Sequence, residues 1–266
     1  MTLLNHRLTG DLPDSAPTLL LIHPMGASLG FWDACLPHWT PHFRTLAVDL
    51  RCAGASPGGT APGLDQHVAD IEALRANLGL SALVPVACAV GCMAAAAYAA
   101  RHADHVVAMV LSNPTPRTAE AARTMLEARA ALVREQGMRA ILPGAVERPF
   151  EAQPRDARYD AYFAAFAAQD AATYAEAVLG FATADARTDL PRVRCPTLLV
   201  PALHDLLLPP ALADEVQALM RPGIARIDLD TQGAHFLPYQ RPAAFAARVL
   251  EFLVPISGQA TVKRGA

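Results

Sequence analysis

The sequence predicts an α/β protein in which a mostly parallel sheet carries helices on both faces and a helical segment interrupts the pattern. Three observations predict this class. Short apolar runs recur along the chain, helical patterns separate most of them, and one long stretch holds helical patterns alone. A chain of 266 residues is long enough for one large α/β core with an insertion.

The apolar runs have strand length and end in turn residues, which is typical of strands buried on both faces of a parallel sheet. Strands are predicted at 17–24, 43–50, 81–88, 105–114, 195–205 and 224–235. Apolar residues at helical spacing predict helices between them, and this alternation indicates βαβ units. The predicted helices span 64–80, 92–103, 211–220 and 241–254.

One stretch, from about residue 115 to 190, carries helical patterns and no strand pattern. It separates two groups of predicted strands, so we expect a helical cap inserted into one sheet. The first part of the core is expected at 1–114, the cap at 115–190 and the second part of the core at 191–255. The polar end of the chain, 256–266, is expected to form a flexible tail.

The composition argues against several classes of protein. Apolar residues make up 53% and charged residues 18%, which is typical of a globular chain. The net charge is -3 and no long basic run occurs, so no nucleic-acid partner is expected. The apolar runs are too short for a membrane-spanning helix, and the first residues lack the pattern of a signal peptide.

The five cysteines form no CxxC pair and no zinc-binding spacing with histidines, so no metal site is expected. A reducing cytoplasm is the simplest location for such a chain. The expected partner is a small molecule, and the sequence is compatible with a homo-oligomer.

The segment "VPVACAVGCMAA" at 84–95 indicates a buried strand, a tight turn and the start of an alanine-rich helix. Ala87, Ala89 and Gly91 fit the spacing of the nucleophile elbow G-x-S-x-G, in which small residues flank the apex of a strained turn. The apex here is Ala89, whose methyl group is no nucleophile. The alternative interpretation is a turn whose small residues serve packing only.

Two later residues complete the order of a hydrolytic triad. Asp205 lies at the end of a predicted strand in "PTLLVPALHDLLLPP", and His235 follows the last strand in "TQGAHFLPYQRP". The order apex, acid, histidine is that of the α/β-hydrolases rather than of other triad folds. Taken alone, Asp205 could cap a loop and His235 could be a solvated side chain.

The segment "LLLIHPMGAS" at 19–28 places a His-x-x-Gly loop after the first long strand. The backbone amides of Met25 and Val90 are candidates for an oxyanion hole, whereas Pro24 has no N–H to donate. We expect His23 to brace this loop rather than to catalyse. Trp32 is a candidate substrate-binding wall, with packing in the core as the equal alternative.

With these residues, the chain resembles the α/β-hydrolase superfamily over about 17–254, and within it the 3-oxoadipate enol-lactonase group. The resemblance rests on "HPMGAS", "DLRCAGAS", the elbow, the segment "EARAALVREQGMRAILPGAVERPF" and the two segments around Asp205 and His235. It implies hydrolysis of a small, carboxylate-bearing ester or lactone without a cofactor. It also implies Asp205 as the acid, His235 as the base, and the Met25 and Val90 amides as oxyanion donors.

Three interpretations of Ala89 remain open. The expected one is a hydrolase with a nucleophile/Asp/His triad, in a serine enzyme altered at residue 89. Alternatively, Ala89 is natural and His235, oriented by Asp205, acts as a general base on water or on substrate in a hydrolase, lyase, decarboxylase or cofactor-free oxygenase. The third interpretation is a binding protein without catalysis.

The cap is expected to roof the pocket, and it carries several arginines. One or two of them could bind a substrate carboxylate, although most cap arginines are expected to lie on a solvated face. These are Arg117, Arg123, Arg129, Arg134, Arg139, Arg148, Arg155 and Arg158.

Overall fold

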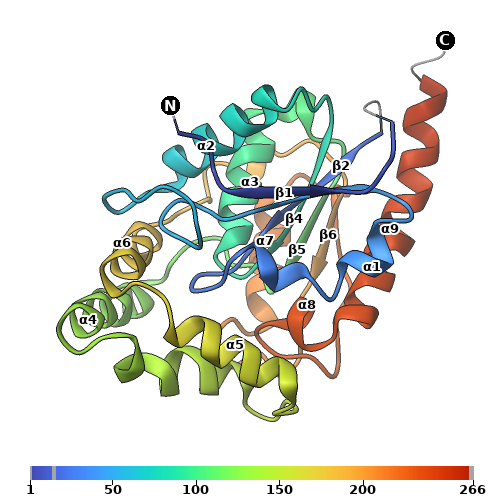
Figure 1. The fold of residues 1–266 in the computed structure, drawn as a ribbon. Coiled ribbons are helices and arrows are strands. Elements are labelled where there is room, and N and C mark those ends of the chain that lie inside the picture. Colours follow the sequence, from blue (N-terminus) through green and yellow to red (C-terminus); the bar gives the residue numbers. More distant parts are fainter. Residues whose placement is uncertain (1, 14–15, 264–266) are drawn as a thin grey trace.

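The computed structural model describes residues 2–13 and 16–263, with side chains described through residue 256. Within these residues the chain forms a seven-stranded sheet of order β1-β3-β2-β4-β5-β6-β7 (Figure 1). β1 is antiparallel to β3, and every other neighbouring pair is parallel. The strands are β1 (His6–Thr9), β2 (Thr18–Ile22), β3 (Arg44–Val48), β4 (Leu83–Cys88), β5 (Met109–Ser112), β6 (Thr197–Val200) and β7 (Ala225–Ile227).

The central strands are buried on both faces because consecutive side chains point to opposite sides of the sheet. In β2, Leu19 and Leu21 belong to one apolar core, and Leu20 and Ile22 belong to the other. The first core includes side chains of α1 (Leu36–Trp39) and α9 (Pro242–Lys263). The second includes side chains of α2 (Leu64–Asn77), α3 (Gly91–Arg101) and α7 (Ala211–Leu219). The predicted α/β class, with helices on both faces of a mostly parallel sheet, is confirmed.

Between β5 and β6 the described chain forms helices and no strand of the sheet. We call residues 113–196 the insertion. Aspartates begin two of its helices: Asp156 accepts hydrogen bonds from the backbone of Arg158 and Tyr159, and Asp170 accepts one from Thr173. The insertion contains α4 (Glu120–Gln136), η3 (Met138–Ile141), η4 (Pro143–Glu147), η5 (Arg148–Phe150), α5 (Ala157–Ala167), α6 (Ala171–Ala182) and η6 (Leu190–Arg192). Figure 1 shows α4, α5 and α6 together beyond one end of the sheet.

Specific contacts hold the insertion against the core. The Gln169 side-chain amide donates to the carbonyl of Gly26 at 2.8 Å, and Gln240 donates to the carbonyl of Pro149 at 2.9 Å. Gly180 of α6 lies so close to the backbone of Pro62 that no side chain would fit there. The insertion is therefore fixed to three separate segments of the core.

The remaining short helices are η1 (Leu29–Trp32), η2 (Ala103–His105) and α8 (Leu237–Gln240). The six predicted strands all occur, in shorter form, whereas β1 was not expected. α9 continues through Lys263, although a flexible tail was expected from residue 256. Ile256 packs against the core beyond Pro255 and anchors this part of the helix, while 264–266 lie outside the described residues. No helix of the described chain is long and apolar enough to cross a membrane.

His67 of α2 is a buried contact between the core and the insertion. Its ring is 1% exposed and stacks on Phe181 of α6 at 5.0 Å between centroids. Burial lowers the pKa of His67 to about 4, and the charge of Asp70 opposes this shift only in part. The imidazole is thus neutral in the folded chain at pH values where the unfolded chain already binds a proton.

We predict that the His67→Phe variant loses less stability than the parent as the pH falls from 6.5 to 4. In the parent, the unfolded state binds the additional proton across this window, so the free energy of unfolding decreases as the pH decreases. The difference between the two proteins should reach about 3 kcal/mol at the acidic end. Urea unfolding at several pH values measures it, and identical pH slopes would contradict the prediction.

Candidate active site

The predicted site residues follow neighbouring strands of the parallel sheet. Ala89 follows β4, Asp205 lies beyond the end of β6, and His235 lies beyond β7. The carboxyl ends of parallel strands meet at one edge of a sheet, where ligands of such folds commonly bind. Segments that are far apart in the sequence therefore converge at this edge.

The turn at Ala89 has the strained geometry of an elbow. Ala89 has a φ of 52°, in the left-handed region that residues with a side chain rarely adopt, and its N–H donates to the Ser112 carbonyl at 2.9 Å. A side chain at Gly91 would lie 2.7 Å from the backbone oxygen of His23, which explains the glycine. The methyl of Ala89 is 2% exposed and lines a cavity.

The structure brings His235 and Asp205 into direct contact. Nδ1 of His235 lies 2.9 Å from one carboxylate oxygen of Asp205 and 3.1 Å from the other. The Asp205 side chain is fully buried and also accepts hydrogen bonds from the backbone N–H groups of Leu207 and Leu208. Because Nδ1 donates to the carboxylate, Nε2 of the neutral ring is the nitrogen left to accept a proton.

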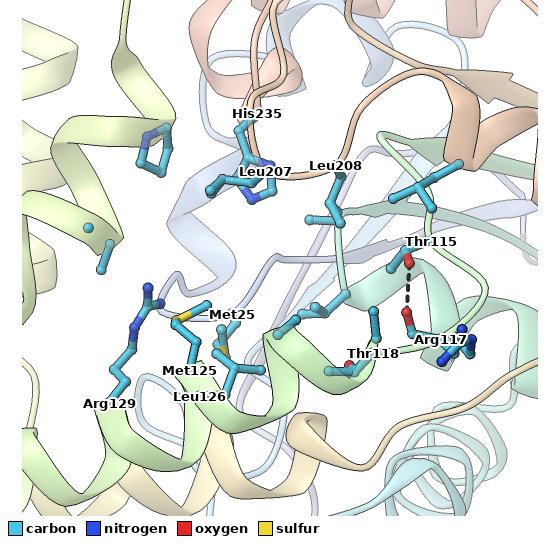
Figure 2. Close-up of a pocket in the computed structure, with 18 of the residues that line it drawn as sticks. Met25, Thr115, Arg117, Thr118, Met125, Leu126, Arg129, Leu207, Leu208 and His235 are labelled. Atoms are coloured by element: carbon cyan, nitrogen blue, oxygen red, sulfur yellow. Dashed lines mark hydrogen bonds between the residues drawn. The ribbon is translucent and has the colours of Figure 1, made fainter.

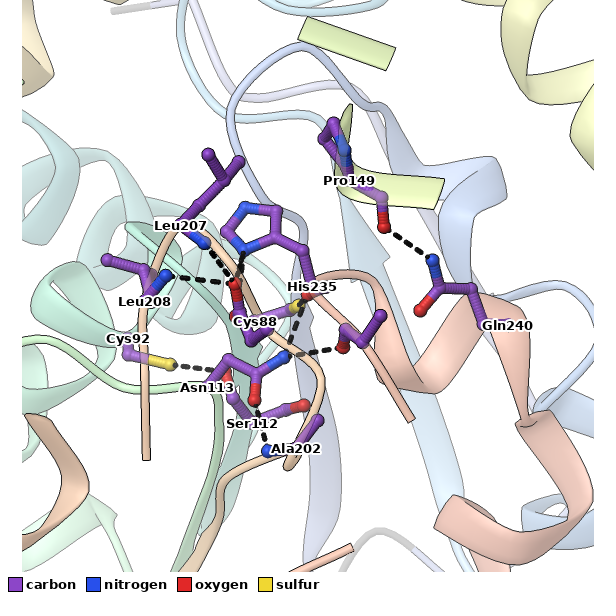
Figure 3. A network of polar contacts seen from close by, with 12 residues as sticks. Cys88, Cys92, Ser112, Asn113, Pro149, Ala202, Leu207, Leu208, His235 and Gln240 are labelled. Atoms are coloured by element: carbon purple, nitrogen blue, oxygen red, sulfur yellow. Dashed lines mark hydrogen bonds and ion pairs between the residues drawn. The ribbon is translucent and has the colours of Figure 1, made fainter. Parts of the chain in front are cut away.

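Asn113 connects the loops that carry the acid and the base (Figure 3). Its side-chain amide donates to the carbonyls of Ala234 and His235 at 2.9 Å each, and its carbonyl accepts from Ala202 N–H at 2.7 Å. The sequence alone does not single out this residue, because an asparagine after a strand is an ordinary turn signal. Its position at the end of β5, between β4 and β6, is known only once the strand order is known.

The predicted oxyanion loop lies beside the elbow. Met25 and Val90 line the same cavity as Ala89, and in the described chain neither backbone amide donates a hydrogen bond to another protein group. Both amides thus remain candidates for the oxyanion hole. The N-terminus of α3 begins at Gly91, so its dipole also favours negative charge here.

His23 braces the loop from inside the core. Nδ1 lies 2.8 Å from the Pro24 carbonyl, and Nε2 accepts a hydrogen bond from the Leu50 N–H at 3.0 Å. Burial lowers the pKa of His23, which keeps Nε2 unprotonated and able to accept. Both ring nitrogens are engaged by backbone groups, so His23 has a structural part in the site.

The cavity has a volume of about 240 Å³ and lies between the elbow, His235 and the insertion (Figure 2). Most of its wall is apolar, as is usual for sites that bind small molecules. Its charged residues, apart from His235, are Arg117, Arg129 and Glu215. Of the eight arginines named above, all within the described chain, Arg117 and Arg129 alone line the cavity.

Trp32 does not form the predicted wall. It is fully buried, packs against Trp39 at 6.1 Å and Phe245 at 6.4 Å between ring centroids, and does not line the cavity. The 3-10 helix that carries Trp32 turns its ring towards α1 and α9, so the alternative, packing in the core, is what the structure shows.

A second cavity of about 450 Å³ is lined by residues of η1 and α5. Phe166 lines both cavities, is 2% exposed and packs edge to face on Tyr174. Phe166 therefore belongs to the walls of both cavities. Within the described residues no group of three or more histidine, cysteine or acidic side chains is placed to hold a metal ion.

Comparison with known proteins agrees with the fold. A family model described as alpha/beta hydrolase fold matches residues 17–242, which include six of the seven strands and the whole insertion. The chain belongs to the α/β-hydrolase family. This α/β-hydrolase also resembles the enol-lactonase group, as the sequence motifs predicted.

Three proteins illustrate the similarity. A protein of Caulobacter sp. (strain K31), provisionally named carbamate hydrolase RutD, is 29% identical over an alignment of 273 positions. The alignment covers 97% of each chain. The 3-oxoadipate enol-lactonase 2 of Acinetobacter baylyi is 26% identical, and the alignment covers 71% of this chain and 72% of that protein. The enol-lactonase structure from Burkholderia xenovorans LB400 has a TM-score of 0.84 at 26% identity. The superposition covers 94% of this chain and 96% of the enol-lactonase chain. The chain is therefore an enzyme of the hydrolase type.

We predict that Phe166→Ala joins the two cavities and admits larger substrates. The ratio of kcat/KM for a long-chain over a short-chain ester should rise about tenfold, since the new space removes a steric barrier of one or more kcal/mol. The variant should also lose about 3–5 kcal/mol of stability from the lost ring. Phe163→Ala is the matched control, because Phe163 lies on the same helix and lines neither cavity. The same chain-length preference in both variants would contradict the prediction.

Proposed function

We propose that this chain hydrolyses a small, carboxylate-bearing acyl compound, such as an ester, an enol-lactone or a carbamate, by direct attack of water. In this proposal His235, held by Asp205, is the general base, and the methyl of Ala89 forms the floor on which the water lies. The observation that carries the proposal is the buried Asp205–His235 pair beside a cavity lined by Ala89. An alanine in place of serine leaves room for about one water oxygen.

The arrangement supports a complete reaction. Water attacks the carbonyl carbon while its proton moves to Nε2 of His235, and the buried Asp205 carboxylate stabilises the imidazolium that forms. The amides of Met25 and Val90 donate to the oxyanion of the tetrahedral intermediate. Collapse of the intermediate breaks the bond to the leaving oxygen or nitrogen, which takes the proton back from His235.

The substrate class is supported by the cavity and by the names of the relatives. Enol-lactonases and carbamate hydrolases, as the similar proteins are named, both act on a carbonyl bonded to a leaving heteroatom. All such reactions pass through an oxyanion, for which the two free amides and the dipole of α3 provide a binding place. A cavity of about 240 Å³ suits a small substrate.

A second candidate is the serine triad of the same fold, in a chain altered at residue 89. The observation that favours it is the φ of 52° at Ala89, a strained conformation that aims a side chain into the site. The strain costs about 1–3 kcal/mol and has an evident use when that side chain is a nucleophile. The two candidates share substrate, acid, base and oxyanion donors, and they differ in the attacking oxygen.

The test compares the chain with His235→Gln and Ala89→Ser on a panel of small esters, lactones and carbamates. We expect the Ala89 chain to turn over without a burst, and we expect His235→Gln to lower kcat by at least about 100-fold. His38→Gln, at an exposed histidine, is the control and should leave kcat unchanged. An inactive Ala89 chain with an Ala89→Ser variant that shows an acyl-enzyme burst would instead support the serine enzyme.

A further inference from the structure

The cavity is lined by two arginines, Arg117 and Arg129, that the proposed water attack does not use. Arg129 extends from α4, on the helix face formed with Ala122 and Leu126, and all three residues line the cavity. Their spacing of three and four residues places them on one side of the helix. Figure 2 shows the Arg129 side chain leaving α4 towards the cavity that His235 also borders.

Arg129 differs from neighbouring arginines of the insertion in having no acidic partner. Arg123 pairs with Glu127 at 2.8 Å, and Arg134 pairs with Glu176 at 2.6 Å. In the part of the chain that the structure describes, Arg129 forms no ion pair. A half-buried guanidinium at an apolar cavity, with no carboxylate beside it, is suited to bind an anionic ligand.

Tyr174 of α6 adds a second donor next to Arg129. Its side chain is 2% exposed and lines the same cavity. Burial raises the pKa of Tyr174, and the adjacent Arg129 guanidinium opposes this only in part, so the hydroxyl stays protonated at neutral pH. A guanidinium and a phenol side by side can both donate to one carboxylate.

The other charged residues at the cavity do not offer the same site. Arg117 bridges to Asp185 through its backbone, and its charge contributes to the lowered pKa of that carboxyl, after the larger effect of Arg187. Glu215 of α7 would repel an anion. An anionic group therefore has its most favourable position at Arg129.

We infer that Arg129 and Tyr174 bind the carboxylate of the substrate and so place its acyl carbon above Ala89. This inference rests on the proposed function, and it adds that the enzyme selects substrates with a carboxylate at the end opposite the reacting carbonyl. Arg129 is a specificity residue, because it contacts the substrate away from the reacting atoms.

The experiment uses Arg129→Met, Arg129→Lys and Tyr174→Phe, with Arg123→Met on the same helix as the control. For each protein, kcat/KM is measured on an acid substrate and on its uncharged amide analogue. Arg129→Met should lower the preference for the acid by about 10- to 100-fold, the range for a lost hydrogen bond to a charged group. The acid preference of Arg129→Lys should lie between those of the parent and Arg129→Met, because lysine keeps the charge but lacks the planar guanidinium. Arg123→Met should have the same acid preference as the parent.

A binding measurement separates this inference from the proposed function. Butyrate is titrated against each variant by NMR chemical shifts, with butyramide as the uncharged control, and thermal unfolding verifies that each variant is folded. If no variant has activity, loss of butyrate binding in Arg129→Met alone still supports the carboxylate site while the proposed function fails. An unchanged acid preference, or equal butyrate binding in Arg129→Met and Arg123→Met, would overturn the inference.

Discussion

The hydrogen bond between Nδ1 of His235 and the Asp205 carboxylate is the interaction on which the site depends. Asp205 is excluded from water, so its charge needs partners, and His235 together with the Leu207 and Leu208 amides supplies them. This set of bonds fixes the ring and its tautomer. Asn113 then holds the backbone of His235 to the end of β6, so the base is positioned by the sheet itself.

The elbow has its strained geometry with an alanine at the apex. Gly91 has no side chain to collide with the backbone after β2, and Val90, which follows the left-handed Ala89, lines the cavity. In the proposed mechanism, the same turn supplies one of the two oxyanion donors and the surface on which the attacking water lies. In the water mechanism this turn still places Val90 at the cavity, although a strained apex has its most evident use in presenting a nucleophile.

Local patterns were sufficient to predict the central strands, the elbow and the order of Asp205 and His235, because each rests on short motifs. The sequence did not predict β1, since its four residues have no apolar run and form a strand only by pairing with β3. Trp32 was ambiguous for a similar reason: a ring near a site can face either way, and packing against α9 decides. Arg129 could be distinguished from the other arginines only by knowing which face of α4 meets the cavity.

The most direct test of the account is a high-resolution crystal structure of the Ala89 protein with butyrate bound. We predict an ordered water about 3 Å from Nε2 of His235, above the Ala89 methyl and within reach of the Met25 or Val90 amide. A ring of His235 turned away from Asp205, or an Nε2 occupied by a protein group instead of solvent, would contradict the central claim.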